Sequence, residues 1–192
     1  GAVNFTGTVA GTAMTLLNTT TITSSTANVT FSSSLITDTY MDYRIAFRNF
    51  SSVTDAQTVY LYPSIDNGSN YNLIEQFLEY HELKNATAFG LATSPNDESR
   101  FYIMASLSNV TTEGTNGVIE LVGLRQTATS HKGIFWNSLG GISSSTGHDS
   151  GNDYWWNGGG KIITASKVNN IKIVLNHGNI AQGTFSLYGI KS

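Results

Sequence analysis

The residues best able to do chemistry gather in one short stretch, TGHDSGNDYWWNGGG, which covers residues 146–160. Three consecutive aromatic residues, Tyr154, Trp155 and Trp156, stand beside polar side chains that can hydrogen-bond a ligand. These polar residues are Asp149, Asn152 and Asp153. Two interpretations fit this composition. The stretch is either an aromatic anchor that contacts a neighbouring subunit, since Tyr and Trp dominate protein interfaces, or a stacking platform for the sugar rings of a glycan.

The two tryptophans are expected to play different parts. If the backbone is extended at Trp155 and Trp156, their side chains point to opposite sides, so one ring faces the core and the other faces out. The polar residues before them have loop composition. The glycines of 158–160 lack the following Lys-Ser/Thr of a phosphate loop, and we expect a flexible turn there.

No other cluster predicts catalysis, a metal site or a cofactor. The chain has no cysteine, and its histidines lack metal-ligand spacing; they are His81, His131, His148 and His177. Glu79, His81 and Glu82 read as the polar positions of a solvated strand, because no second carboxylate wall is evident. Asp66-Asn67-Gly68 predicts a tight hairpin turn rather than a calcium loop. We therefore expect a protein that is not an enzyme and binds no metal and no cofactor.

The charge content and the length of the apolar runs exclude two classes of partner, nucleic acids and the interior of a membrane. Only 12% of residues are charged, the net charge is −3, and no basic cluster occurs. Nucleic-acid binding through phosphate neutralisation is therefore not expected. No apolar run approaches the roughly 20 residues that span a bilayer, so no membrane insertion is expected.

Alternation of apolar and polar residues predicts strands along most of the chain. In residues 43–50, Tyr43, Ile45 and Phe47 fall on one face and arginines on the other. Further strands are expected in 57–65, 100–107, 117–124, 132–137, 169–177 and 183–190, with Pro63 marking an edge or bulge. Residues 73–84 fit either a helix or a strand, and a strand is predicted because a tight turn precedes them.

Such a pattern predicts an all-β fold: a single jelly-roll-like, two-sheet antiparallel β-sandwich over residues 23–192. Residues 1–22 are expected to form an extended N-terminal arm. Residues 1–37 contain no charged side chain and favour extended structure. An uncharged β edge needs a covering partner, so we expect a homo-oligomer.

Several segments together resemble a family of virion structural proteins of tailed bacteriophages, common among marine phages and cyanophages. They are YMDYRIAFRNF, TDAQTVYLYPSIDNGSNY, GVIELVGL and the closing GNIAQGTFSLYGIK, which is the most specific. The match runs from about residue 23 to about residue 191. It departs from the family pattern between roughly 126 and 160, so the resemblance says nothing about the aromatic stretch.

The resemblance implies a non-enzymatic virion protein, assembled in the cytoplasm of the bacterial host and exposed on the particle surface. A capsid decoration (cement) or head-fibre protein is expected, because the chain has no long shaft; the alternative is a receptor- or glycan-binding domain of a tail fibre or tail appendage. Expected partners are copies of the chain itself, by analogy a trimer, together with other capsid or tail proteins and a host surface glycan.

Overall fold

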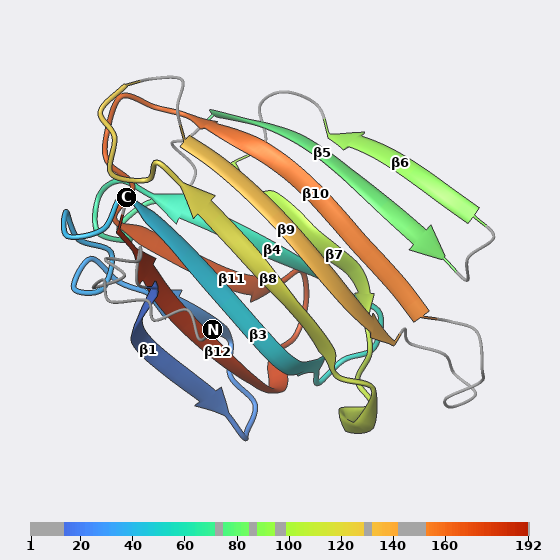
Figure 1. Ribbon diagram of the computed structural model, residues 1–192. Helices are drawn as coiled ribbons and strands as arrows, with labels where there is room; N and C mark the ends of the chain where they lie inside the picture. Colours follow the sequence, from blue (N-terminus) through green and yellow to red (C-terminus); the bar gives the residue numbers. More distant parts are fainter. Residues whose placement is uncertain are drawn as a thin grey trace, which may run out of the picture.

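A computed structural model of the chain describes residues 14–71, 75–84, 88–94, 99–128, 132–141 and 153–191. Within these ranges it contains two antiparallel β-sheets, one short 3-10 turn, η1 (Thr111–Glu113), and no α-helix. Figure 1 shows the larger sheet in front of the smaller one. The expectation of an all-β, two-sheet antiparallel sandwich is confirmed.

The sheets differ in size. The larger has eight strands, in the spatial order β1 (Met14–Ile22), β12 (Ile180–Ile190), β3 (Asp42–Ser52), β8 (Thr115–Val122), β9 (Lys132–Gly141), β10 (Asp153–Ile163), β5 (Glu75–Lys84) and β6 (Ala88–Ser94). The smaller has four, in the order β2 (Asn28–Phe31), β11 (Asn170–Leu175), β4 (Gln57–Ser64) and β7 (Phe101–Leu107).

The path of the chain between the sheets is that of a jelly roll. The chain crosses from one sheet to the other after β1, β2, β3, β4, β6, β7, β10 and β11. As a result, strands far apart in sequence become neighbours: β2 pairs with β11, and β3 pairs with β8. The strands β1-β12-β3-β8 of the large sheet and β2-β11-β4-β7 of the small sheet have the order of the eight-stranded double Greek key of jelly rolls. The strands β9, β10, β5 and β6 extend the large sheet beyond β8 (Figure 1).

The core lies between the sheets and follows the predicted alternation. Tyr43, Ile45 and Phe47 of β3 are at most 2% exposed, whereas Arg44 and Arg48 point away from the core. The small sheet contributes alternate apolar residues in the same way, among them Val59, Leu61, Ile171 and Ile173. Strands such as β3, β4 and β11 thus bury one face, which is why a period of two in the sequence predicts their orientation.

One buried tyrosine ties a connection to the core. The Tyr43 hydroxyl donates a hydrogen bond to the carbonyl oxygen of Thr37, 2.7 Å away, and accepts one from the Thr37 amide at 2.8 Å. Burial raises the pKa of the Tyr43 hydroxyl. The phenol therefore stays neutral and fixes the connection between β2 and β3.

The tight turn at Asn67-Gly68 is confirmed, but it does not make a hairpin. Both residues have positive φ, 60° and 83°, as the sequence predicted. The Asp66 carboxylate accepts hydrogen bonds from Ser64 and from both the amide and the side chain of Asn70. The prediction of a hairpin is wrong because β4 before the turn and β5 after it belong to different sheets.

The ambiguous segment 73–84 contains strand β5, as predicted, which pairs with β10 on one side and β6 on the other. Pro63 lies beyond the last β4–β7 pair, Leu61 with Phe101, and still faces Ile171 of β11. Among the described strands, no residue of β7 pairs with Pro63. The amide proton that proline lacks therefore leaves no β7 hydrogen bond unmade.

Residues 14–22 of the predicted N-terminal arm form β1, which pairs with β12 along its whole length. This part of the arm is an edge strand of the large sheet. Residues 1–13 lie outside the described residues.

Three connections meet at one ion-pair cluster. Asp38, after β2, accepts hydrogen bonds from Arg125 and from Lys167 at 2.8–3.0 Å. Arg125 also donates to the carbonyl oxygen of Val168 at 3.0 Å. These hydrogen bonds lower the pKa of the Asp38 carboxyl, first through Lys167 and then through Arg125.

Replacing Asp38 with Asn should lower the free energy of unfolding at pH 7 slightly, since the carboxylate is largely exposed. A lowered carboxyl pKa adds stability above the unfolded value of about 3.9, and this contribution is lost as the pH falls through the folded value. The difference between wild type and Asp38→Asn should therefore shrink between about pH 5 and pH 2. Urea unfolding of both proteins across this range measures it; a difference that stays constant would contradict the assignment.

Candidate functional site

The described part of the aromatic stretch, residues 153–160, lies on a strand and not in a loop. Residues 142–152 are outside the described residues, and with them Asp149 and Asn152. Asp153, Tyr154, Trp155 and Trp156 open strand β10, which pairs with β9 and β5. For Asp153 and Tyr154 the structure describes the backbone, which faces Gly141 and Gly140 of β9. Residues 153–160 therefore do not belong to the expected loop.

The expected flexible turn at Gly158-Gly159-Gly160 is wrong, because these glycines lie inside β10. They pair with Trp136, Phe135 and Ile134 of β9 and with β5 on the other side. A Cβ at Gly159 would lie 3.1 Å from Cδ1 of Phe135. Glycine at this position therefore leaves room for the phenylalanine ring of the neighbouring strand.

The two tryptophans point to opposite faces, as the extended backbone predicted. Trp156 is 0% exposed and lies in the core between the sheets. Trp155 lies half-buried on the outer face, where its indole Nε1 donates a hydrogen bond to Oδ1 of Asn137, 2.9 Å away. The hydrogen bond holds the exposed ring against β9 in a fixed orientation.

Trp155 shares the outer face of the large sheet with exposed residues of β9, to which the sequence interpretation gave no contact role. Phe135 is 55% and Leu139 57% exposed, and Asn137 lies between them. Leu139 is the register partner of Trp155, and Asn137 is the register partner of Asn157. We call Phe135, Asn137, Leu139, Trp155 and Asn157 the β9 surface.

The sequence did contain a signal for the β9 surface. In GIFWNSLGG, large apolar residues occupy both alternating sets: Ile134 and Trp136 on one face, Phe135 and Leu139 on the other. A strand with one solvated face should have polar residues in one set. Apolar residues in both sets therefore indicate a face with a contact role.

A shallow depression of about 490 Å³ adjoins the β9 surface. Asn137 and Leu139 form one side, and Ala46 and Arg48 of β3 form the other, with Val118 between them. The small side chain of Ala46 creates the hollow. Because the depression is open and holds one charged group, it suits a contact with a protein or ligand surface better than catalysis.

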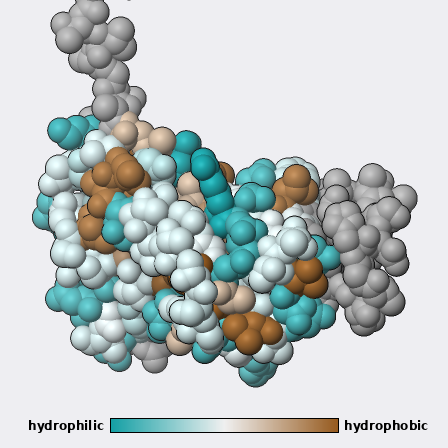
Figure 2. All heavy atoms as spheres, turned by 90° about the horizontal axis from the view of Figure 1, so that it is seen from below, coloured by the Kyte–Doolittle hydropathy of each residue, from teal (hydrophilic) through white to brown (hydrophobic). Residues whose placement is uncertain are grey.

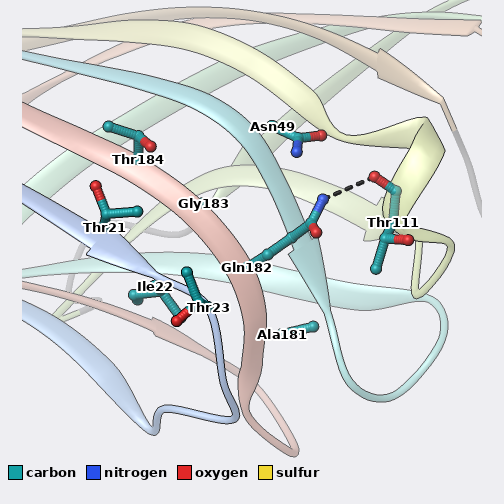
Figure 3. A pocket seen from close by; sticks show the side chains of 9 residues that line it. All are labelled: Thr21, Ile22, Thr23, Asn49, Thr111, Ala181, Gln182, Gly183 and Thr184. Carbon is teal, nitrogen blue, oxygen red and sulfur yellow. Dashed lines mark hydrogen bonds between the residues drawn. The ribbon is translucent and has the colours of Figure 1, made fainter.

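A second hollow, of about 370 Å³, lies where β1 and β12 approach η1. Figure 3 shows it lined by hydroxyl and amide side chains, with Nε2 of Gln182 donating to the Thr111 carbonyl oxygen at 2.7 Å. The lining residues are Thr21, Ile22, Thr23, Asn49, Thr111, Ala181, Gln182, Gly183 and Thr184. With no titratable side chain in its wall, this hollow offers hydrogen bonds but no general acid or base.

Among the described residues, no group of three or more His, Cys, Asp or Glu side chains could hold a metal ion. The segment with Glu79, His81 and Glu82 is in β5, where the backbones of these residues face Gly159, Asn157 and Trp156. Hydrogen bonds from Asn70 and Ser64 to the Asp66 carboxylate lower its pKa and close the turn after β4.

Among the described residues, no helix is long and apolar enough to cross a membrane.

The two tryptophans provide a matched pair of substitutions. Trp156→Ala should lower the free energy of unfolding by about 3–5 kcal/mol, because it leaves a cavity in the core. Trp155→Ala should cost about 1 kcal/mol or less, the size of one hydrogen bond, and should weaken association with a neighbouring subunit or ligand. Thermal melting and sedimentation measure both effects; equal destabilisation without any change in association would mean that Trp155 has no contact role.

Comparison with known proteins gives no relative: no family model, no curated protein and no solved structure matches the chain.

Proposed function

We propose that this chain is a non-enzymatic structural protein of a bacteriophage virion, exposed on the particle surface as a capsid decoration or head-fibre protein. The β9 surface carries the proposal. It presents two large apolar side chains and a fixed tryptophan among neutral amides, which is the composition of a protein contact. The jelly roll is a fold of viral capsid proteins, and the segments that resemble phage virion proteins form strands of this sandwich, among them β3, β8 and β12.

The edge of the large sheet supports assembly with further copies. Among the described strands, β1 pairs with β12 alone, and none of its nine residues is charged or a proline. Soluble proteins usually protect such an edge with charges, prolines or bulges; β1 has one irregularity, near Leu16. A second copy of the chain is the partner that fits an uncharged edge, and a trimer remains our proposal for the assembly.

The exposed surface is consistent with contacts of mixed character. In Figure 2 the hydrophobic residues form several small, separate groups on a largely pale and teal surface. No large apolar patch is visible on that face. We infer that contacts combine small apolar groups with neutral hydrogen bonds.

Copy number per particle tests the proposed location. Quantitative mass spectrometry of purified virions should find this chain in numbers comparable to the major capsid protein. A few copies per particle would place it on the tail and contradict the proposed role in capsid decoration.

Introducing a charge into the β9 surface should weaken self-association. Leu139→Asp and Phe135→Asp should each raise the dissociation constant by about tenfold or more, because a carboxylate is costly to bury at an interface. Val53, which is 50% exposed in another part of the molecule, gives the control Val53→Asp, which should leave association unchanged.

Sedimentation velocity at about 50 mM and about 1 M sodium chloride measures this association. The wild-type assembly should persist at both concentrations, because screening weakens charge pairs and not apolar contacts. If Leu139→Asp, Phe135→Asp and Val53→Asp change the dissociation constant equally, the β9 surface is not the interface. Dissociation of the wild type at high salt would also rule it out.

The second candidate function is a receptor- or glycan-binding domain of a tail fibre or tail appendage. The half-exposed ring of Trp155 beside Asn137 and Asn157 favours it, because an aromatic ring with adjacent amides can stack on a sugar and bind its hydroxyls. Retention of neutral glycans on an array, lost in Trp155→Ala, would favour this function over a purely structural one.

A further inference from the structure

The outer face of the small sheet carries a cluster of tyrosines on the opposite side of the sandwich from the β9 surface. Tyr60 and Tyr62 belong to β4, Tyr102 to β7, and Tyr71 follows the turn after β4. The ring centroids of Tyr60 and Tyr102 are 4.8 Å apart, those of Tyr60 and Tyr62 6.2 Å, and those of Tyr62 and Tyr71 6.5 Å. All three pairs meet edge to face, the favoured geometry of aromatic pairs.

Two cations lie on these rings. The Arg100 guanidinium carbon is 4.4 Å from the centre of the Tyr60 ring, and Nη1 of Arg100 is 3.4 Å from the Tyr62 hydroxyl. Lys172 Nζ is 3.8 Å from the centre of the Tyr71 ring and 5.4 Å from that of Tyr62. Tyr62 therefore lies between the two positive charges. We call these four tyrosines with Arg100 and Lys172 the tyrosine face.

The four strands of the small sheet supply no negative charge to the tyrosine face. None of them contains Asp or Glu. One carboxylate in the turn after β4, that of Asp66, acts on the edge of this face, where burial and then the Asp66 charge raise the pKa of Tyr71. Within the described residues, the contacts of the Lys172 ammonium are the two tyrosine rings. Burial among them lowers the pKa of Lys172, so a negative charge at this position would restore the interaction that the ammonium loses with water.

The positive charge of Lys172 is held in place and is accessible. The Lys172 ammonium lies over the Tyr71 ring. The ring is fixed by a hydrogen bond that the Tyr71 hydroxyl donates to Oδ1 of Asn170, 2.8 Å away. Tyr62, Tyr71, Arg100 and Lys172 are all partly exposed, whereas Tyr60 is buried beneath them. A pre-positioned charge loses little entropy when a ligand binds.

We propose that the tyrosine face binds an acidic saccharide, with a sugar carboxylate at Lys172 and the carbon-bound face of the sugar ring on the exposed tyrosines. A tyrosine presents an apolar ring together with a hydroxyl, which matches a sugar that has an apolar face and a rim of hydroxyls. The lysine selects an acidic sugar over a neutral one. This site is separate from the β9 surface and goes beyond the structural role, since it does not depend on where the protein sits on a particle.

An oligogalacturonate is the probe, and the same oligosaccharide with its carboxylates methyl-esterified is the neutral control. Isothermal titration of the full chain should show binding of the acid and binding of the ester at least about tenfold weaker, the loss expected for a hydrogen bond to a charged group. Affinity for the acid should fall as salt is added. A glutamate peptide of equal charge should bind more weakly than the saccharide; equal binding would mean that charge alone is recognised and would overturn the saccharide assignment.

Substitution of Lys172 tests the site itself. Lys172→Met should weaken oligogalacturonate binding by about tenfold or more, and Lys172→Arg should retain most of it. Lys161→Met is the matched control, because Lys161 is an exposed strand lysine on the other sheet, and it should bind as the wild type does. Equal affinities of Lys172→Met and Lys161→Met would overturn the proposal.

A measurement on the wild type keeps the test independent of how the variants fold. On titration with oligogalacturonate, the backbone amide resonances of β4, β7 and β11 should shift. Shifts confined to β9 and β10, or no binding at millimolar probe, would also overturn the tyrosine face as the site. Neither result would bear on copy number or self-association, which test the proposed function separately.

Discussion

The structure depends on the burial of the inner faces of two sheets against each other. Trp156 and Trp136 of the large sheet lie within this layer, and the Trp136 ring meets Phe101 of the small sheet edge to face at 6.3 Å. With no cysteine in the chain, no disulfide supports this contact. Apolar burial between the sheets therefore orders every strand and decides which side chains remain outside.

The two outer faces that result have different chemistry. The large sheet exposes Phe135, Leu139 and Trp155 among amides, whereas the small sheet exposes tyrosines with Lys172 and Arg100. The first surface suits a neutral protein contact, and the second suits an acidic ligand. Because the core lies between them, one surface can be occupied while the other remains free.

A low charge content shapes the remaining contacts. Many side-chain hydrogen bonds in the described residues connect neutral groups to the backbone, such as that from Gln57 to the Asp55 carbonyl oxygen and that to Asn176 from the Thr58 amide. The ion pairs join mainly connections, as around Asp38. We infer that screening by salt affects the fold little.

The sequence by itself determined many of the strands and which of their sides is buried, as in β3, but not β6 or β10. These properties are local: alternation orients Tyr43, Ile45 and Phe47, and the same rule separates Trp155 from Trp156. The positive φ values at Asn67-Gly68 were predictable for the same reason, since they depend on two adjacent residues.

Only the tertiary structure decided which strands become neighbours, because apolar burial is non-directional and does not specify the pairing. The turn at Asn67-Gly68 looked like a hairpin, and it joins two sheets. Gly158-Gly159-Gly160 looked like a turn, yet these glycines continue β10 between β9 and β5, and the Phe135 ring of β9 lies beside Gly159. The tyrosine face could not be read from the sequence either: Tyr62, Arg100 and Lys172 meet only because sheet pairing brings β4, β7 and β11 side by side.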